Sequence, residues 1–265
     1  MTTRLIVAGA SGAVGKALIQ RIARESDLAL VGAVSRNAAG RDAGEVAGIG
    51  PLGVTISASL DQAMAADAHI VIDYTKPGAV KAHALSAIAR KLAVVIGTSG
   101  LTAADYADID AAARGAGVGV HAAGNYSITA TLLRRFALEA AKYVPDVEII
   151  DFAGAAKPDV PSGTGRELAE QLAAVRGAPT SVPVDKLTGA RETRGADVAG
   201  TRVHSVRMPG YLLSCEVLLG LPDERLSIRH DSMPSPHIYV AGTLMAARRV
   251  REWTGLRRGL ETVMS

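Results

Sequence analysis

The stretch that decides the fold is "RLIVAGASGAVGKALIQRIARES", residues 4–26. It opens with a short apolar run typical of a buried strand and ends in an amphipathic helical pattern, and Gly9, Gly12 and Gly15 stand between the two. Glycine allows a sharp turn and lets the backbone approach a pyrophosphate, which the amides of the helix N-terminus then bind. This spacing also occurs in plain turns, but its place between an N-terminal strand and a helix predicts a dinucleotide-binding loop.

Strand and helix patterns continue to alternate up to about residue 124. A repeat of this kind predicts a parallel sheet with helices on both faces, which binds its ligand at the carboxyl ends of the strands. We therefore expect an α/β, Rossmann-like domain over residues 1–124. The expected strands after the first are 28–35, 68–75, 92–99 and 117–123, and the expected helices after the first are 77–91 and 102–117.

From about Asn125 the pattern changes to one typical of an α+β domain. Consecutive strand patterns joined by turns favour a mixed or antiparallel sheet, so we expect a second domain over residues 125–239. The last segment, residues 240–265, is expected to be a helix with a basic, solvated end that packs back on the first domain. Within the second domain the expected helices are 127–144 and 162–175, and the expected strands are 146–154, 202–210, 211–220 and 224–232.

Composition narrows the class of protein. Hydrophobic residues make up 48% and charged residues 21%, as in ordinary globular proteins, and a net charge of +3 is too small to favour nucleic-acid binding. No apolar run of about 18 residues occurs, so no membrane span is expected. The single cysteine, Cys215, lies in a strand-like run and is expected to be a buried thiol. It excludes an intramolecular disulfide and, with an N-terminus unlike a signal peptide, favours a cytoplasmic protein.

Two strand ends bear on the cofactor. The second expected strand ends in "GAVSRN", so Ser35 and Arg36 stand where a carboxylate would normally accept the ribose hydroxyls of NADH. An arginine here can pair with a 2′-phosphate, which favours NADPH and leaves NADH possible; the alternative is a solvated loop arginine. The sequence "GTSG" at 97–100 offers small residues for a nicotinamide ring, although it could equally be a simple turn.

A second motif, "KPDVPSGTG" at 157–165, predicts an anion site. Ser162 is expected to be the N-cap of the following helix, whose first amides would face a carboxylate, with the Lys157 ammonium nearby. The alternative is that Lys157 is a solvated loop residue. No histidine stands with Cys, Asp or Glu at the spacing of a metal site, so no metal is expected.

Together, "VAGASGAVG", "DYT", "VIGTSG", "AGNYSI", "KPDVPSGT" and "HSVRMPG…IRHDS" resemble the 4-hydroxy-tetrahydrodipicolinate reductase (dihydrodipicolinate reductase) family of lysine and diaminopimelate biosynthesis. The resemblance extends in order over nearly the whole chain. It implies an NAD(P)H-dependent oxidoreductase that reduces a cyclic dicarboxylate. It also implies that the second domain binds the substrate and forms a homotetramer through its sheet.

The resemblance also assigns site residues. Arg36 would lie beside the 2′-phosphate, and Lys157, Ser162, Gly163 and Thr164 would bind the substrate carboxylate. Lys157 is left as the best catalytic proton donor. The pyrophosphate loop would be Gly9, Ala10, Ser11, Gly12, Ala13 and Val14, and the nicotinamide would lie by Gly97, Thr98, Ser99, Ala123, Gly124, Asn125 and Tyr126.

The chain departs from the family pattern just before Lys157. The family usually carries a His-His pair four and three residues ahead of this lysine, where this chain has Ala153 and Gly154. A methyl group and a hydrogen cannot donate a proton, so the departure leaves two alternatives open. One is an imine reductase or amine dehydrogenase with another substrate, and the other is a non-catalytic NADPH-binding homologue that acts as a regulator or scaffold. His237, in a proline-rich loop, is a lesser candidate for the missing acid.

Overall fold

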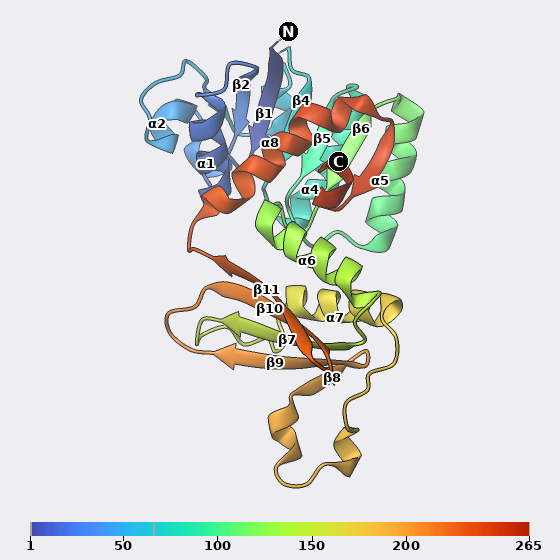
Figure 1. The fold of residues 1–265 in the computed structure, drawn as a ribbon. Coiled ribbons are helices and arrows are strands. Elements are labelled where there is room, and N and C mark those ends of the chain that lie inside the picture. The colour runs from blue at the N-terminus through green and yellow to red at the C-terminus, as the bar shows by residue number, and fades with distance from the viewer. Residues whose placement is uncertain (1, 66, 265) are drawn as a thin grey trace. The chain divides into compact units, whose positions relative to one another are not determined.

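The computed structural model describes residues 2–65 and 67–264. They form two compact units, one made of the chain up to Ile128 together with the segment from Pro236, and the other of Thr129–Ser235 (Figure 1). Each unit has its own sheet and its own hydrophobic core.

The first unit is built on a seven-stranded sheet in the order β12-β6-β5-β4-β1-β2-β3, in which every neighbouring pair is parallel. The predicted Rossmann-like sheet is thereby confirmed. The order reverses at β1, with β4 on one side and β2 on the other, so the carboxyl end of β1 is a topological switch point. The strands are β1 (Thr3–Ala8), β2 (Leu28–Val34), β3 (Ile56–Ser57), β4 (Ile70–Asp73), β5 (Ala93–Ile96), β6 (Gly119–Ala122) and β12 (Gly255–Arg258).

Helices cover both faces of this sheet. On one face, Leu5 and Val7 pack against Leu18 of α1 and Leu244 of α8. On the other, inward-facing residues of the same strands pack against α4 and α5. Thr102 begins α5 with a reciprocal capping box to Asp105. The helices are α1 (Ala13–Ile22), α2 (Ala43–Ala47), α3 (Leu60–Ala63), α4 (Pro77–Ala89), α5 (Ala103–Ala116) and α8 (Val240–Arg249), with short 3₁₀ turns at 36–38, 236–239, 250–252 and 260–263.

The predicted basic helical end of the chain is wrong beyond Arg249. Residues Gly255–Arg258 form strand β12, which pairs in parallel with β6 at the edge of the sheet. Gly255 has a φ of +88°, which a right-handed helix cannot accommodate, and its amide bonds to the Val118 carbonyl instead. The guanidinium of Arg257 lies 4.4 Å from the centre of the Trp253 ring, so part of the basic charge is stacked on an aromatic side chain.

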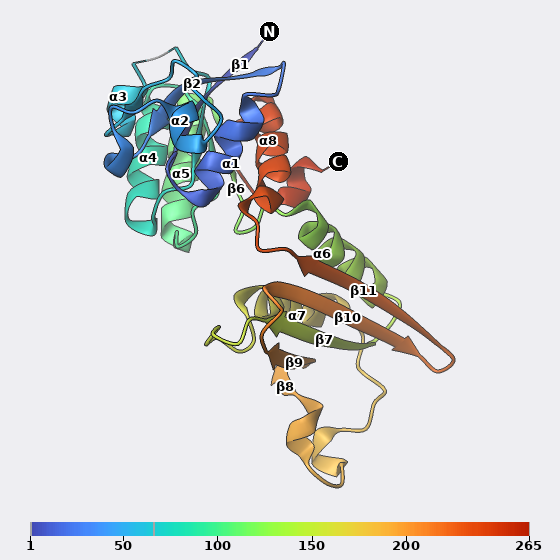
Figure 2. The ribbon, with the colours of Figure 1, turned by 90° about the vertical axis from the view of Figure 1, so that its left-hand side faces the viewer.

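The second unit contains a five-stranded mixed sheet in the order β11-β10-β7-β9-β8. Strands β7 and β9 are parallel and the other pairs are antiparallel, which confirms the predicted mixed sheet. Figure 2 shows its long strands together with α6 and α7. The elements are α6 (Ile128–Ala141), β7 (Asp146–Ala153), α7 (Gly163–Val175), β8 (Ala196–Val198), β9 (Thr201–Arg207), β10 (Leu213–Leu221) and β11 (Glu224–Ser232), with 3₁₀ turns at 184–186 and 191–194.

Alternate residues of this sheet form the second core. Val147 and Ile149 of β7 and Val217 of β10 pack with Leu168 and Leu172 of α7. Cys215 belongs to the same cluster, and burial raises the pKa of its thiol to about 12, so it is a buried thiol as predicted. Within the residues described, no helix has the length and apolar character needed to cross a membrane.

Candidate functional site

The loop after β1 has the geometry of a phosphate-binding turn. Gly9 adopts a φ of +90°, and a Cβ there would lie only 2.3 Å from the Tyr74 carbonyl oxygen. A Cβ on Gly15 would lie 2.1 Å from the Gly9 carbonyl oxygen, so helix α1 reaches the strand only because this residue has no side chain. The amides of Ala13, Val14 and Gly15, in the first turn of α1, have no partner within the described part of the chain. They are open donors where the helix dipole favours an anion.

This loop opens onto a cleft of about 770 Å³ within the first unit. Arg36 and Lys76 give it positive charge. Among the described lining residues the one acidic side chain, Asp61, accepts a hydrogen bond from Ser86 and pairs with Arg90 at 3.3 Å. Ser35 directly follows β2, and its hydroxyl lies 2.6 Å from that of Ser11. The lining residues are Gly9, Ser11, Gly12, Val34, Ser35, Arg36, Asn37, Ala58, Ser59, Leu60, Asp61, Tyr74, Thr75, Lys76, Gly78, Ala79, Ala82, His83 and Ser86.

Asp73, at the carboxyl end of β4, ties together the segments at this edge of the sheet. Its side chain is 1% exposed and accepts hydrogen bonds from the hydroxyls of Thr75 and Thr98, both at 2.7 Å, and from the amide of Thr75. The Nδ1 atom of His83, from α4, lies 2.7 Å from the other carboxylate oxygen. Burial by itself would raise the pKa of Asp73, but these donors outweigh it and hold the pKa below its ordinary value. Sequence reasoning gave Asp73 no role, although a carboxylate at the end of a buried strand was a usable signal.

The predicted nicotinamide residues lie along the neighbouring strand ends and do not line the cleft just described. Gly97 is packed under the ring of Tyr74, because a Cβ there would lie 2.1 Å from the Cζ atom of that ring. The Tyr74 hydroxyl lies 2.6 Å from the Thr243 hydroxyl, which in turn donates to the Tyr239 carbonyl. Tyr74 is therefore the donor to Thr243. The position of the turn at 97–99 therefore depends on the Tyr74 ring, which its hydrogen bond to Thr243 holds in place.

Tyr126 contributes its side chain to the core. It is 1% exposed, and its hydroxyl lies 2.9 Å from Nδ1 of His121 and donates to the Ile96 carbonyl. His121 is fully buried, and burial lowers its pKa to about 4, so it is a neutral residue of the core near pH 7. Tyr126 can reach a cofactor only through its backbone. Asn125 turns its side chain back to accept the Ser127 amide at 2.8 Å.

In the second unit, the start of α7 has the features of a carboxylate site. Ser162 is the N-cap, as predicted, since its hydroxyl accepts the Gly165 amide at 3.1 Å. The Arg166 amide bonds to the Ser162 carbonyl. The amides of Gly163 and Thr164 have no partner among the described residues, so two donors stay open at the positive end of a helix.

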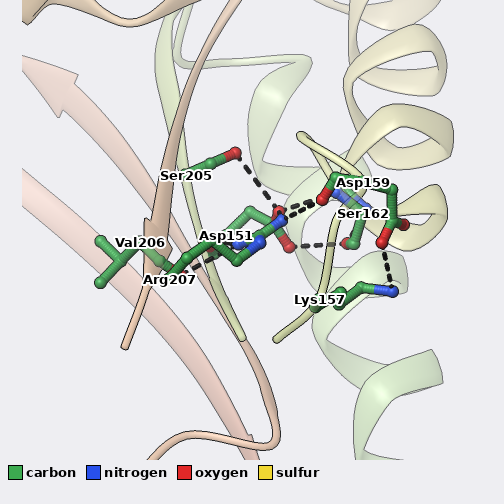
Figure 3. Close-up of polar contacts among 8 residues, drawn as sticks. Asp151, Lys157, Asp159, Ser162, Ser205, Val206 and Arg207 are labelled. Carbon is green, nitrogen blue, oxygen red and sulfur yellow. Dashed lines mark hydrogen bonds and ion pairs between the residues drawn. The ribbon is translucent and has the colours of Figure 1, made fainter. Parts of the chain in front are cut away.

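Lys157 lies in the loop that leads to this helix start (Figure 3). Its side chain is 31% exposed, its ammonium pairs with Asp159 at 2.8 Å, and its backbone amide bonds to the Gly154 carbonyl. The hydrogen bond from Lys157 lowers the pKa of Asp159. The Lys157 side chain is thus positioned by its ion pair with Asp159, and both side chains remain partly exposed to solvent.

The Ser162 hydroxyl is already committed within the protein. It donates to Asp151 Oδ1 at 2.6 Å, while the Ser162 amide donates to Oδ2 of the same carboxylate at 2.8 Å. Asp151 also pairs with Arg207 at 2.7 Å. Sequence reasoning missed both charged residues, although Asp151 lies two residues before Ala153 in the same strand, and Arg207 ends the quoted "HSVR" motif.

At the positions of the family's histidine pair, the chain is closely packed. Ala153 is fully buried, and its carbonyl accepts the Met208 amide at 3.2 Å. A Cβ on Gly154 would lie 3.2 Å from the Tyr211 carbonyl oxygen, so any side chain there needs a small backbone shift. Residues 2–65 and 67–264 contain no group of three or more His, Cys, Asp or Glu side chains placed to hold a metal ion.

The two halves of the chain match two halves of one family. Residues 3–126 match the family model "Dihydrodipicolinate reductase, N-terminus", and residues 129–264 match "Dihydrodipicolinate reductase, C-terminus". The chain is 37% identical over 263 residues to 4-hydroxy-tetrahydrodipicolinate reductase of Desulfitobacterium hafniense, covering 98% of each chain. It is 37% identical over 266 residues to the Moorella thermoacetica enzyme of that name, covering 99% of this chain and 98% of that one.

Solved structures agree with this result. Dipicolinate-bound dihydrodipicolinate reductase from Paenisporosarcina sp. TG-14 superposes with a TM-score of 0.88 at 27% identity, covering 100% of both chains. Amine dehydrogenase from Mycobacterium smegmatis gives 0.66 at 16% identity, covering 97% of this chain and 95% of that one, which shows a shared fold alone.

The parallel sheet, the glycine loop at its switch point and the open amides of α1 define a dinucleotide-binding oxidoreductase with an added α+β unit. The chain belongs to the dihydrodipicolinate reductase family, whose members are NAD(P)H-dependent oxidoreductases.

Proposed function

We propose that this protein reduces 4-hydroxy-tetrahydrodipicolinate, or a closely similar cyclic dicarboxylate, in the lysine and diaminopimelate pathway. The observation that carries the proposal is the match to both family halves, over residues 3–126 and 129–264. The open amides of Gly163 and Thr164, with Lys157 nearby in the chain, support it because they suit a carboxylate.

For the cofactor, we assign the pyrophosphate to the loop Gly9–Val14 and the amides of α1. Arg36 is assigned to the 2′-phosphate of NADPH. No carboxylate stands at the end of β2 to accept ribose hydroxyls, and the Ser35 hydroxyl is already bonded to Ser11. NADPH is therefore the expected cofactor, and NADH is expected to bind more weakly. When bound, the nicotinamide supplies a hydride, and Gly97, Thr98, Ser99 and Ala123–Tyr126 are the residues assigned to it.

Lys157 is the proton donor in this proposal. Ala153 and Gly154 have no ionisable group, whereas Lys157 carries an ammonium that Asp159 holds at 2.8 Å. Gly163 and Thr164 bind the substrate carboxylate through their amides, and Ser162 supports them as the N-cap. In this assignment Lys157 both attracts the carboxylate and gives up the proton.

The protein is proposed to act in the cytoplasm as a homotetramer formed through the sheet of its second unit. That unit exposes several large apolar side chains, among them Leu213 at 39% and Leu226 at 46%. Light scattering on the purified protein measures the mass directly. A monomer at micromolar concentration would contradict this part of the proposal.

The experiment that tests the function is a coupled assay. Dihydrodipicolinate synthase, pyruvate and aspartate semialdehyde generate the substrate, and loss of NADPH absorbance measures its reduction. A matched control lacks the synthase. Steady NADPH oxidation that depends on the synthase supports the proposal, while NADPH binding without oxidation would contradict it.

A further inference from the structure

One buried carboxylate, on the strand before the loop that carries Lys157, holds the far end of that loop. Asp151, at the end of β7, is 3% exposed and accepts the amide and the hydroxyl of Ser162, the first residue beyond the loop. The Ser205 hydroxyl is a more distant donor, at 3.4 Å. Asp151 therefore sets the separation between the strand that the chain leaves and the helix that it enters.

Arg207, on the neighbouring strand β9, holds the middle of the same loop. Its Nη2 atom donates to Asp151 Oδ2 and to the Asp159 carbonyl, both at 2.7 Å, and its Nη1 atom donates to the Asp151 carbonyl at 3.0 Å. In Figure 3 the guanidinium lies between Asp151 and the loop segment at Asp159. Asp159 is in turn the ion-pair partner of Lys157, so a single residue, Asp159, links Arg207 to the Lys157 ammonium.

A purely structural role accounts poorly for this arginine. Its side chain is 13% exposed, and its Nε atom is buried with no hydrogen-bond partner in the part of the chain that the structure describes. Burying an ion pair and leaving a donor unmatched brings little or no net stability compared with apolar residues of similar size. An explanation in terms of the neighbouring site is therefore stronger.

The charges of Asp151 and Arg207 favour a role in the neighbouring carboxylate site. Asp151 is bonded directly to Ser162, the residue before the open amides of Gly163 and Thr164. An uncompensated carboxylate at this place would repel the anion that those amides attract. Arg207 supplies the compensating charge and, through its fork of donors, also fixes the loop.

We infer that Arg207 is a positioning residue of the carboxylate site: it neutralises Asp151 and fixes the loop that carries Lys157. This inference rests on the proposed function for the identity of the ligand, but its test does not require turnover. Dipicolinate, the compound bound in the Paenisporosarcina enzyme, serves as the dicarboxylate probe.

The experiment measures binding of dipicolinate by calorimetry to the full chain and to two variants, Arg207→Met and Arg207→Lys. Arg207→Met is expected to weaken dipicolinate binding at least about tenfold, the equivalent of one hydrogen bond to a charged group. Arg207→Lys keeps the charge but loses the fork, so its loss is expected to be smaller, about threefold. NADPH binding should stay within about twofold in both variants, because the hydrogen bonds from Arg207 to Asp151 and Asp159 lie within the second unit, whereas the glycine loop belongs to the first.

Arg134→Met is the matched control. It also removes a charge from the second unit, where Arg134 pairs with Glu167 at 3.2 Å between α6 and α7. Dipicolinate binding by this variant should match the wild type. If Arg207→Met does not fold, the dipicolinate affinity of Arg207→Lys decides whether Arg207 positions the site.

Wild-type affinity for dipicolinate in folded Arg207 variants would overturn the inference. Equal losses in the Arg207→Met and Arg134→Met variants would overturn it too, as would a wild type that binds no dipicolinate. A wild type that binds dipicolinate but fails in the coupled assay rejects the proposed function alone, because the binding comparison still decides the role of Arg207.

Discussion

Replacing Gly97 by alanine should destabilise the first unit through a single contact. The new Cβ would lie 2.1, 2.3 and 2.6 Å from three atoms of the Tyr74 ring, distances that real Cβ atoms do not tolerate. The ring cannot move away freely, because its hydroxyl is bonded to Thr243 and its side chain is partly buried against the core around β1 and α8.

The loss of stability in Gly97→Ala can be estimated from the two ways in which the structure can respond to the new methyl group. Overpacking a well-packed site costs about 1–3 kcal/mol. A ring that shifts to relieve the clash also loses a net hydrogen bond worth about 1 kcal/mol. We therefore expect Gly97→Ala to lower the free energy of unfolding by about 2–4 kcal/mol and to weaken NADPH binding, since the turn at 97–99 is displaced.

Urea denaturation of the variants measures this loss, and fluorescence titration measures NADPH binding. Gly115→Ala is the control, since Gly115 lies in the last turn of α5 with open space around its Cβ position. That substitution should stabilise the protein by up to about 1 kcal/mol.

A double-mutant cycle with Tyr74→Leu tests the cause. If the Tyr74 ring is responsible, Gly97→Ala should cost much less in the Tyr74→Leu background. An equal cost in both backgrounds would refute the reasoning.

Three further outcomes are expected. Arg36→Ala should narrow the preference for NADPH over NADH by about 1–3 kcal/mol in fluorescence titrations, and a wild type that binds NADH more tightly would refute the assignment. Lys157→Met should leave NADPH affinity unchanged and lower both kcat and kcat/KM, whereas a rise in KM alone would make Lys157 a carboxylate anchor and unchanged kinetics would reject both roles. Asp73→Asn should cost about 3 kcal/mol at pH 7, because its amide would face donors. The pKa of Asp73 is lowered in the folded state, so its contribution is complete above the ordinary value of 3.8 and is lost as the pH falls through the folded pKa. The gap between wild type and Asp73→Asn in urea denaturation should therefore shrink at acid pH, and a gap independent of pH would contradict this account.

The sequence was sufficient for the fold class because local patterns and overall architecture agree in this chain. The strand and helix patterns up to residue 124 lead directly to a parallel sheet, and the later strand run leads to a mixed one. Strand β12 could not be recognised in the same way. It is four residues long, follows a basic helix without a strong break before Gly255, and gains its hydrogen bonds only from β6, which is distant in the sequence.

Part of the candidate site could also be predicted from the sequence, because some of its residues belong to local motifs. Gly9, Ser162 and Lys157 belong to contiguous motifs whose chemistry is local. Asp73 with His83, and Asp151 with Arg207, depend on contacts between separate segments, across as many as 56 positions in the case of Arg207. Such pairs become visible only when the register of the strands is known.

Synthase-dependent oxidation of NADPH is the most direct test of the central claim, that a family member without the histidine pair still reduces the pathway substrate. The account predicts steady oxidation by the wild type that Lys157→Met greatly reduces and that Arg134→Met leaves unchanged. A wild type that binds NADPH and dipicolinate yet oxidises no NADPH when the synthase supplies substrate would contradict it.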